Sequence, residues 1–83
     1  MVQTQNELAE FFKKNANALF GQLKYSEAAE EYSKAIELDP SVPVYWANRA
    51  FANIKLENYG YAIMDAEEAI KLDPAYIKVS NLV

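Results

Sequence analysis

The chain is an internal duplication. Displacing the sequence by 34 residues superposes one half on the other, and the matching positions follow helical intervals. The matched pairs are Ala16 with Ala50, Ala18 with Ala52, Tyr25 with Tyr59, Ala28 with Ala62, Ala35 with Ala69 and Ile36 with Ile70. Each unit ends on the same Leu-Asp-Pro, at 38–40 and at 72–74. A period of this length predicts a supersecondary unit stacked against its own copy.

Within each unit the pattern predicts a helix, a turn and a second helix. Thr4 followed by Glu7 fits a capping box at the start of a helix over 5–21. Ser26 is expected to cap a helix that runs to about Leu38, where Asp39-Pro40 stops it. Ser41 with Pro43 starts a helix to about 56, Asn58 caps one over 59–72, and Asp73 caps a short fifth helix over 75–82. With no long period-2 alternation, the predicted fold is all-α, two repeats and a partial helix in a right-handed superhelical stack.

Small and aromatic side chains are both expected at the contacts between the predicted helices. Alanine at the repeated positions lets antiparallel helices approach closely, while aromatic rings fill the spaces between them. The alanines are Ala16, Ala28, Ala35, Ala50, Ala62 and Ala69, and the rings are Phe12, Phe20, Tyr25, Tyr32, Trp46 and Tyr59. The pattern leaves Tyr61 and Tyr76 open between the core and the surface.

Composition excludes several classes of function. The 83 residues include no cysteine and no histidine, so thiolate metal sites and the usual neutral-pH general base are missing. We therefore expect a protein that is not an enzyme and needs no cofactor or metal. A net charge of −4 disfavours general attraction to nucleic acid or to an anionic membrane. With no export signal visible, the expected location is the cytoplasm or the nucleus.

The repeat pattern resembles the tetratricopeptide repeat family over residues 9–76. Unit one carries the family's pattern in Phe12, Ala16, Ala28, Tyr32, Ala35 and Pro40, and unit two in Trp46, Ala50, Ala62, Ala69 and Pro74, with Ala66 in place of an aromatic residue. The resemblance implies one domain over 1–83. Its first repeat covers 9–42, its second 43–76, and a partial third 77–83.

The segments 45–50 and 59–62 resemble, more narrowly, the repeat domains of the protein phosphatase 5 group of Hsp90 and Hsp70 co-chaperones. That resemblance implies a carboxylate clamp for the C-terminal Glu-Glu-Val-Asp of these chaperones. The matching peptide-binding residues are Lys13, Asn17, Asn48 and Lys78. Leu82 stands where the family has an arginine, so the implied clamp is partial.

The residues support that chemistry without the family. Lys13 and Asn17 are four positions apart and share one face of the predicted first helix. Lysine supplies charge and asparagine supplies neutral donors, each able to bind a terminal carboxylate. The competing interpretation is an ordinary solvated helix face. For Arg49, the sole arginine, pairing with an acidic neighbour is favoured over ligand contact, and the acidic residues of the second and fourth helices, Asp65 among them, are expected on outer faces.

A second function stays open beside peptide binding. The predicted fifth helix carries apolar residues, namely Tyr76, Ile77, Val79, Leu82 and Val83, and is too apolar for a solubilising cap. The alternative expectation is self-association through this end, which would make the chain a scaffolding or regulatory fragment without a working clamp.

Overall fold

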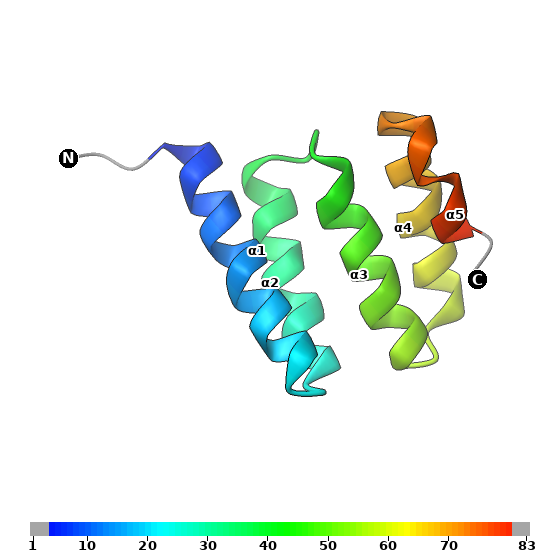
Figure 1. The fold of residues 1–83 in the computed structure, drawn as a ribbon, viewed down its shortest axis with the longest axis horizontal. Coiled ribbons are helices and arrows are strands. Elements are labelled where there is room, and N and C mark those ends of the chain that lie inside the picture. Colours follow the sequence, from blue (N-terminus) through cyan, green and yellow to red (C-terminus); the bar gives the residue numbers. More distant parts are fainter. Residues whose placement is uncertain (1–3, 81–83) are drawn as a thin grey trace.

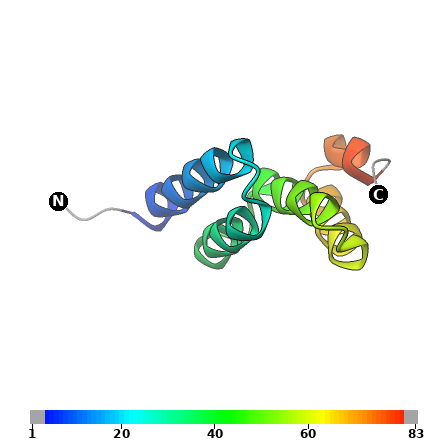
Figure 2. The same ribbon diagram turned by 90° about the horizontal axis from the view of Figure 1, so that it is seen from below.

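The computed structural model describes residues 4–80 and is helical throughout, as the sequence predicts. The elements are α1 (Gln5–Gly21), α2 (Tyr25–Leu38), α3 (Pro43–Lys55), α4 (Tyr59–Leu72), a 3₁₀ turn (Pro74–Tyr76) and α5 (Ile77–Ser80). Figure 1 shows α1 and α2 as one antiparallel pair and α3 and α4 as a second pair beside it. In Figure 2, α1 and the C-terminal turn lie on the upper side of the stack and α2 on the lower side.

The starts of the helices confirm some of the predicted caps and correct others. The Thr4 hydroxyl accepts from the Glu7 backbone N–H, and the Glu7 carboxylate accepts from the Thr4 N–H, which completes the predicted capping box. Ser26 is not an N-cap, because α2 begins at Tyr25. Ser41 is not one either: its hydroxyl donates to the Asp39 carboxylate at 2.7 Å.

Of the other two predicted caps, one lacks the capping hydrogen bond and one is confirmed. Asn58 stands at the N-cap of α4, but its side chain makes no capping hydrogen bond. Asp73 does cap the C-terminal segment, since its carboxylate accepts from the Ala75 N–H at 3.0 Å. The first turn after it is a 3₁₀ helix, so α5 begins only at Ile77.

The turn inside each repeat has a residue in the left-handed backbone conformation at the same repeat position. Leu23 has φ 65° and Glu57, 34 residues later, has φ 62°. Such residues end helices by turning the next N–H back onto the last carbonyls. Lys24 N–H bonds the Leu19 carbonyl at 2.9 Å, and Asn58 N–H bonds the carbonyl five residues before it at 2.8 Å. The duplication therefore extends to the backbone conformation of the turns.

The core consists mainly of alanine, with large side chains packed around it. All six repeated alanines predicted to lie between helices are fully buried. Of the predicted aromatic fillers Tyr32 is buried, whereas Tyr59 is half exposed and therefore does not fill an inter-helix space. Tyr45, which the pattern did not single out, is fully buried. Tyr61 is exposed, and Tyr76 packs against the alanines of the second repeat.

Among the residues described, no helix has the length and apolar character that crossing a bilayer requires.

Candidate functional site: a groove shared by two repeats

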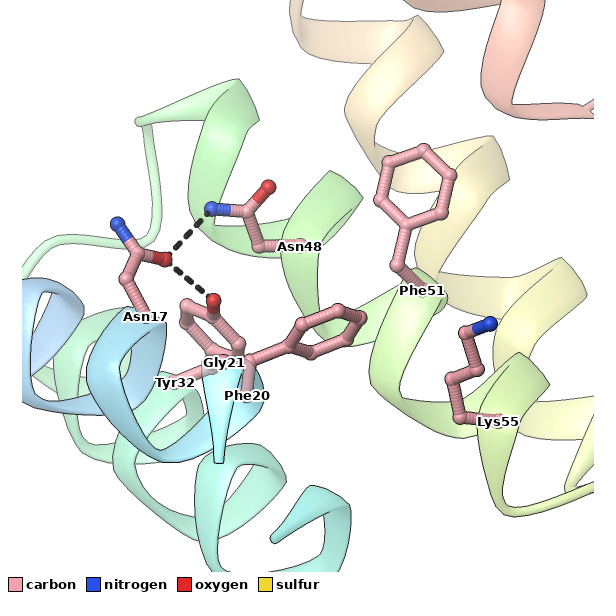
Figure 3. A pocket seen from close by; sticks show the side chains of 7 residues that line it. All are labelled: Asn17, Phe20, Gly21, Tyr32, Asn48, Phe51 and Lys55. Carbon is pink, nitrogen blue, oxygen red and sulfur yellow. Dashed lines mark hydrogen bonds between the residues drawn. The ribbon is translucent and has the colours of Figure 1, made fainter. Parts of the chain in front are cut away.

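An open groove of about 520 Å³ lies where α1 and α3 face each other. Its lining comes from both repeats: Asn17, Phe20, Gly21, Tyr32, Asn48, Phe51 and Lys55. Figure 3 shows the two asparagines on one side of the groove, the two phenylalanine rings between them and Lys55, and Lys55 at the far side. The groove is thus polar at one end, apolar in the middle and cationic at the other end.

Asn17 and Asn48, two of the predicted peptide-binding residues, meet in this groove. Asn48 Nδ2 lies 3.4 Å from Asn17 Oδ1, a long hydrogen bond just beyond the usual distance for N–H···O pairs. The buried Tyr32 hydroxyl also donates to Asn17 Oδ1. Burial raises the pKa of the Tyr32 phenol, and the nearby Asn48 amide offsets this only in part, so the hydroxyl remains a proton donor.

Lys13 lies one turn before Asn17 on α1 but does not line the groove. Its ammonium group is paired with the Glu10 carboxylate at 2.9 Å. Glu10 in turn accepts a hydrogen bond from the hydroxyl of Tyr45 on α3. The bonds from Tyr45 and Lys13 hold the pKa of Glu10 below its ordinary value of 4.5, so Glu10 stays charged beside Lys13.

The structure does not bring the fourth predicted residue to the groove. Lys78 is exposed on α5 and is not among the lining residues. Leu82 lies outside the described residues. The polar part of the site that the structure does assemble therefore consists of the two asparagines, with Lys13 beside them.

Sequence reasoning missed three lining residues that have a clear helical signal. Phe51 and Lys55 follow Asn48 by three and seven positions, and Phe20 follows Asn17 by three. Residues at these spacings share one face of a helix. Extending the asparagine faces along both helices would have placed these three side chains in the groove.

Arg49, which follows Asn48 on α3, does not line this groove but pairs with an acidic residue, as predicted. Its Nε and Nη2 donate to the two carboxylate oxygens of Asp65 at 2.9 and 2.7 Å, and its Nη1 donates to the Ser33 hydroxyl at 2.9 Å. Asn53 Nδ2 donates to the same carboxylate at 3.0 Å. Asp65 is only 4% exposed, so the expectation that it lies on an outer face is wrong.

The acidic residues do not gather into a metal site in the described part of the chain. No group of three carboxylate side chains there is close enough to hold a metal ion. Three exposed glutamates, Glu27, Glu30 and Glu37, lie on α2, and Glu67 is exposed on α4, as expected. The chemistry that the groove offers is hydrogen bonding and charge attraction to an extended anionic ligand.

Comparison with known proteins agrees with the repeat architecture. One family model, described as TPR repeat, matches residues 16–57, and another, described as Tetratricopeptide repeat, matches residues 43–76. The human serine/threonine-protein phosphatase 5 is 49% identical over 70 residues, which cover 84% of this chain and 14% of the phosphatase. The chain therefore spans about a seventh of that relative's length.

Two solved structures share the fold. The TPR domain of Arabidopsis OM64 superposes with a TM-score of 0.88 at 28% identity, covering 90% of this chain and 62% of that one. The first TPR of Spaghetti (RPAP3), bound to the HSP90 peptide SRMEEVD, superposes with a TM-score of 0.84 at 36% identity, covering 94% and 60%. Family models, relatives and structures agree with the two helix pairs described above. The chain belongs to the tetratricopeptide repeat family and is a protein-interaction module.

Proposed function

We propose that the chain binds the acidic C-terminal peptide of Hsp90 or Hsp70 through a partial carboxylate clamp. One observation carries the proposal: Asn17 and Asn48, from successive repeats, meet at 3.4 Å in an open groove. Two amide side chains from different repeats form a site that exists only when the repeats are stacked. Lys13 adds a positive charge one turn away on the same helix.

The order of chemical groups along the groove supports a ligand of this kind. A terminal carboxylate needs several aimed donors, and the asparagine end supplies amides beside an ammonium group. The rings of Phe20 and Phe51 offer an apolar surface next to that end, and Lys55 offers a second positive charge beyond them. A peptide that ends in Glu-Glu-Val-Asp has its charged and apolar groups in a matching order.

The related structures support the same ligand class. The Spaghetti (RPAP3) domain, 36% identical to this chain, is bound to an HSP90 peptide that ends in EEVD. Tetratricopeptide repeats are non-catalytic, and the phosphatase relatives match over a short part of their length. We therefore propose binding without catalysis. Lys78, which is exposed on α5 and does not line the groove, stays a predicted fourth contact.

Calorimetric titration with the pentapeptide Met-Glu-Glu-Val-Asp tests the proposal. Lys13→Ala and Asn48→Ala each remove a hydrogen bond to a charged group, worth about 1.5–3 kcal/mol, so affinity should fall roughly 10- to 150-fold. Lys71→Ala is the matched control, because Lys71 is an exposed lysine on α4 that lies outside the groove. The proposal is wrong if the wild-type chain does not bind at millimolar peptide, or if Lys13→Ala binds as the wild type does.

Self-association is the second candidate, and exposed apolar side chains at the C-terminal half favour it. Ile63 is 43% exposed, Met64 65% and Ile77 54%. Ala29 is the residue of the first repeat that corresponds to Ile63, and it lies in the cleft that α2 forms with α3 and α4. Ile63 therefore marks the face of α4 on which a further helix pair would pack. Sedimentation at high micromolar concentration should then show dimers, which Met64→Glu disperses. A monomer at that concentration would remove this candidate.

A further inference from the structure

Tyr32 contributes a buried hydroxyl to the floor of the groove, where it contacts a residue of the proposed clamp. The residue is only 2% exposed, and its hydroxyl donates to Asn17 Oδ1. Asn48 Nδ2 approaches the same oxygen from the second repeat. Figure 3 shows both dashed lines converging on Oδ1, while Asn17 Nδ2 points away from both partners.

We propose that Tyr32 is the positioning residue of this groove: its hydroxyl fixes the Asn17 amide with the N–H end toward the ligand. This inference rests on the proposed function, because it names what gives Asn17 its selectivity for a carboxylate. An asparagine amide has two ends of nearly equal size and opposite polarity. With the N–H end outward Asn17 attracts a carboxylate, and with the carbonyl end outward it repels one.

The hydroxyl determines this orientation because its proton needs an acceptor. If the Asn17 amide turned over, Nδ2 would face both the Tyr32 hydroxyl and Asn48 Nδ2. The phenol could then accept a hydrogen bond, but its own buried proton would lose the acceptor it has in this structure. A buried donor without a partner is costly, so the turned-over amide is disfavoured. Burial also keeps the phenol protonated, since it raises its pKa.

The second repeat shows that a tyrosine at this place is not needed for stacking. Moving 34 residues along the chain takes Asn17 to Phe51 and Tyr32 to Ala66. Phe51 packs directly against the alanine cluster that contains Ala66, so its ring occupies space that the smaller residue leaves. The tyrosine hydroxyl therefore occurs in the repeat that carries the asparagine. In the other repeat, phenylalanine replaces the asparagine and alanine replaces the tyrosine.

Tyr32→Phe tests the inference because it keeps the ring and removes the hydroxyl. We expect the affinity for Met-Glu-Glu-Val-Asp to fall about five- to tenfold, as for the loss of one hydrogen bond that orders a ligand contact. The preference for the free C-terminal acid over the same peptide with a C-terminal amide should shrink as well. In an Asn17→Ala background, Tyr32→Phe should cause no further loss, because its effect passes through Asn17.

Two controls separate this role from a general effect on folding. Tyr61→Phe removes a hydroxyl from an exposed tyrosine and should leave affinity unchanged. Thermal unfolding of each variant reports whether the fold is retained. Equal peptide affinity and equal acid preference in Tyr32→Phe and wild type would overturn the inference, and so would an undiminished effect in the Asn17→Ala background.

A second measurement keeps the inference testable if the proposed function fails. The side-chain NH₂ resonances of Asn17 in the free protein report the orientation of the amide without any peptide. Tyr32→Phe should shift them strongly and give Nδ2 contacts to more than one neighbour. Unchanged resonances would overturn the positioning role even in a chain that binds no peptide, whereas loss of peptide binding in the wild type alone would overturn only the proposed function.

Discussion

The Arg49 guanidinium on α3 forms a bidentate ion pair with the Asp65 carboxylate on α4, with N···O distances of 2.9 and 2.7 Å. Its third nitrogen donates to the Ser33 hydroxyl on α2, so one side chain connects the second helix pair to the first. Arg49 Cζ also lies over the Trp46 ring, 5.2 Å from the ring centre. The groove exists only when α1 and α3 keep their relative placement. By connecting α3 to α2, Arg49 stabilises that placement although it does not itself line the groove.

Arg49→Met should lower the free energy of unfolding by about 3 kcal/mol, because it leaves the buried Asp65 charge without its partner. The double variant Arg49→Met, Asp65→Leu should recover most of that loss, since it removes both charges and fills the space. Urea unfolding measures both. Lys71→Met is the control: this exposed lysine pairs with Glu68 at 3.5 Å, and its loss should cost less than about 0.5 kcal/mol. Equal costs for Arg49→Met and Lys71→Met would contradict the assigned role.

Ala16→Leu should destabilise the fold by about 1–3 kcal/mol, because Ala16 is fully buried where α1 packs against α2 and has no room for a larger side chain. Ala18→Leu, two residues later on the same helix, is the matched control, since Ala18 is exposed. Melting temperatures compare the two directly. If both variants melt alike, the repeated alanines do not set the helix spacing.

Tyr45→Phe should cost about 1 kcal/mol at pH 7, where the hydroxyl bonds a charged Glu10 that is partly exposed to water. The pKa of Glu10 is lower in the folded chain than its ordinary 4.5, so this stabilisation is present above pH 4.5 and is lost as pH falls through the folded value. Unfolding of wild type and Tyr45→Phe between pH 3 and 7 should therefore give a difference that shrinks at the acid end. A difference independent of pH would show that Glu10 is not the partner that matters.

Lys55→Ala should weaken binding of Met-Glu-Glu-Val-Asp several-fold at low salt and less at high salt, because the exposed ammonium group attracts an upstream glutamate through water. Titrations at two ionic strengths measure this. Lys71→Ala, an exposed lysine outside the groove, should leave affinity unchanged at both. An effect of Lys55→Ala that salt does not reduce would contradict the electrostatic explanation.

The helices and their order were predictable because the duplication and the Leu-Asp-Pro stops are visible as residue types. The turns were less so. Leu23 and Glu57 adopt the left-handed conformation usually left to glycine, and nothing in their chemistry signals it. The residue types in this turn therefore suggest Ser26 as the N-cap, whereas α2 already begins at Tyr25.

The candidate site was predictable in part, for a different reason. The family resemblance predicts Asn17 and Asn48 as site residues, and the two do meet, but the sequence does not show which side-chain atoms they turn toward the ligand. The partners of polar side chains depend on contacts across helices: Tyr32 reaches Asn17 over 15 positions, and Tyr45 reaches Glu10 over 35. Asp65 illustrates the same limit, since its helical spacing suggested an outer face while Arg49 and Asn53 hold it inside.

The most direct test of the account is calorimetric titration of the wild-type chain with two peptides that differ in one group. One is Met-Glu-Glu-Val-Asp with a free C-terminal carboxylate, and the other carries a C-terminal amide. If Asn17 and Asn48 present donors to the chain end, amidation should lower affinity at least about tenfold, equivalent to one charged hydrogen bond. Equal affinity for the two peptides would contradict the claim that this groove recognises a C-terminal carboxylate.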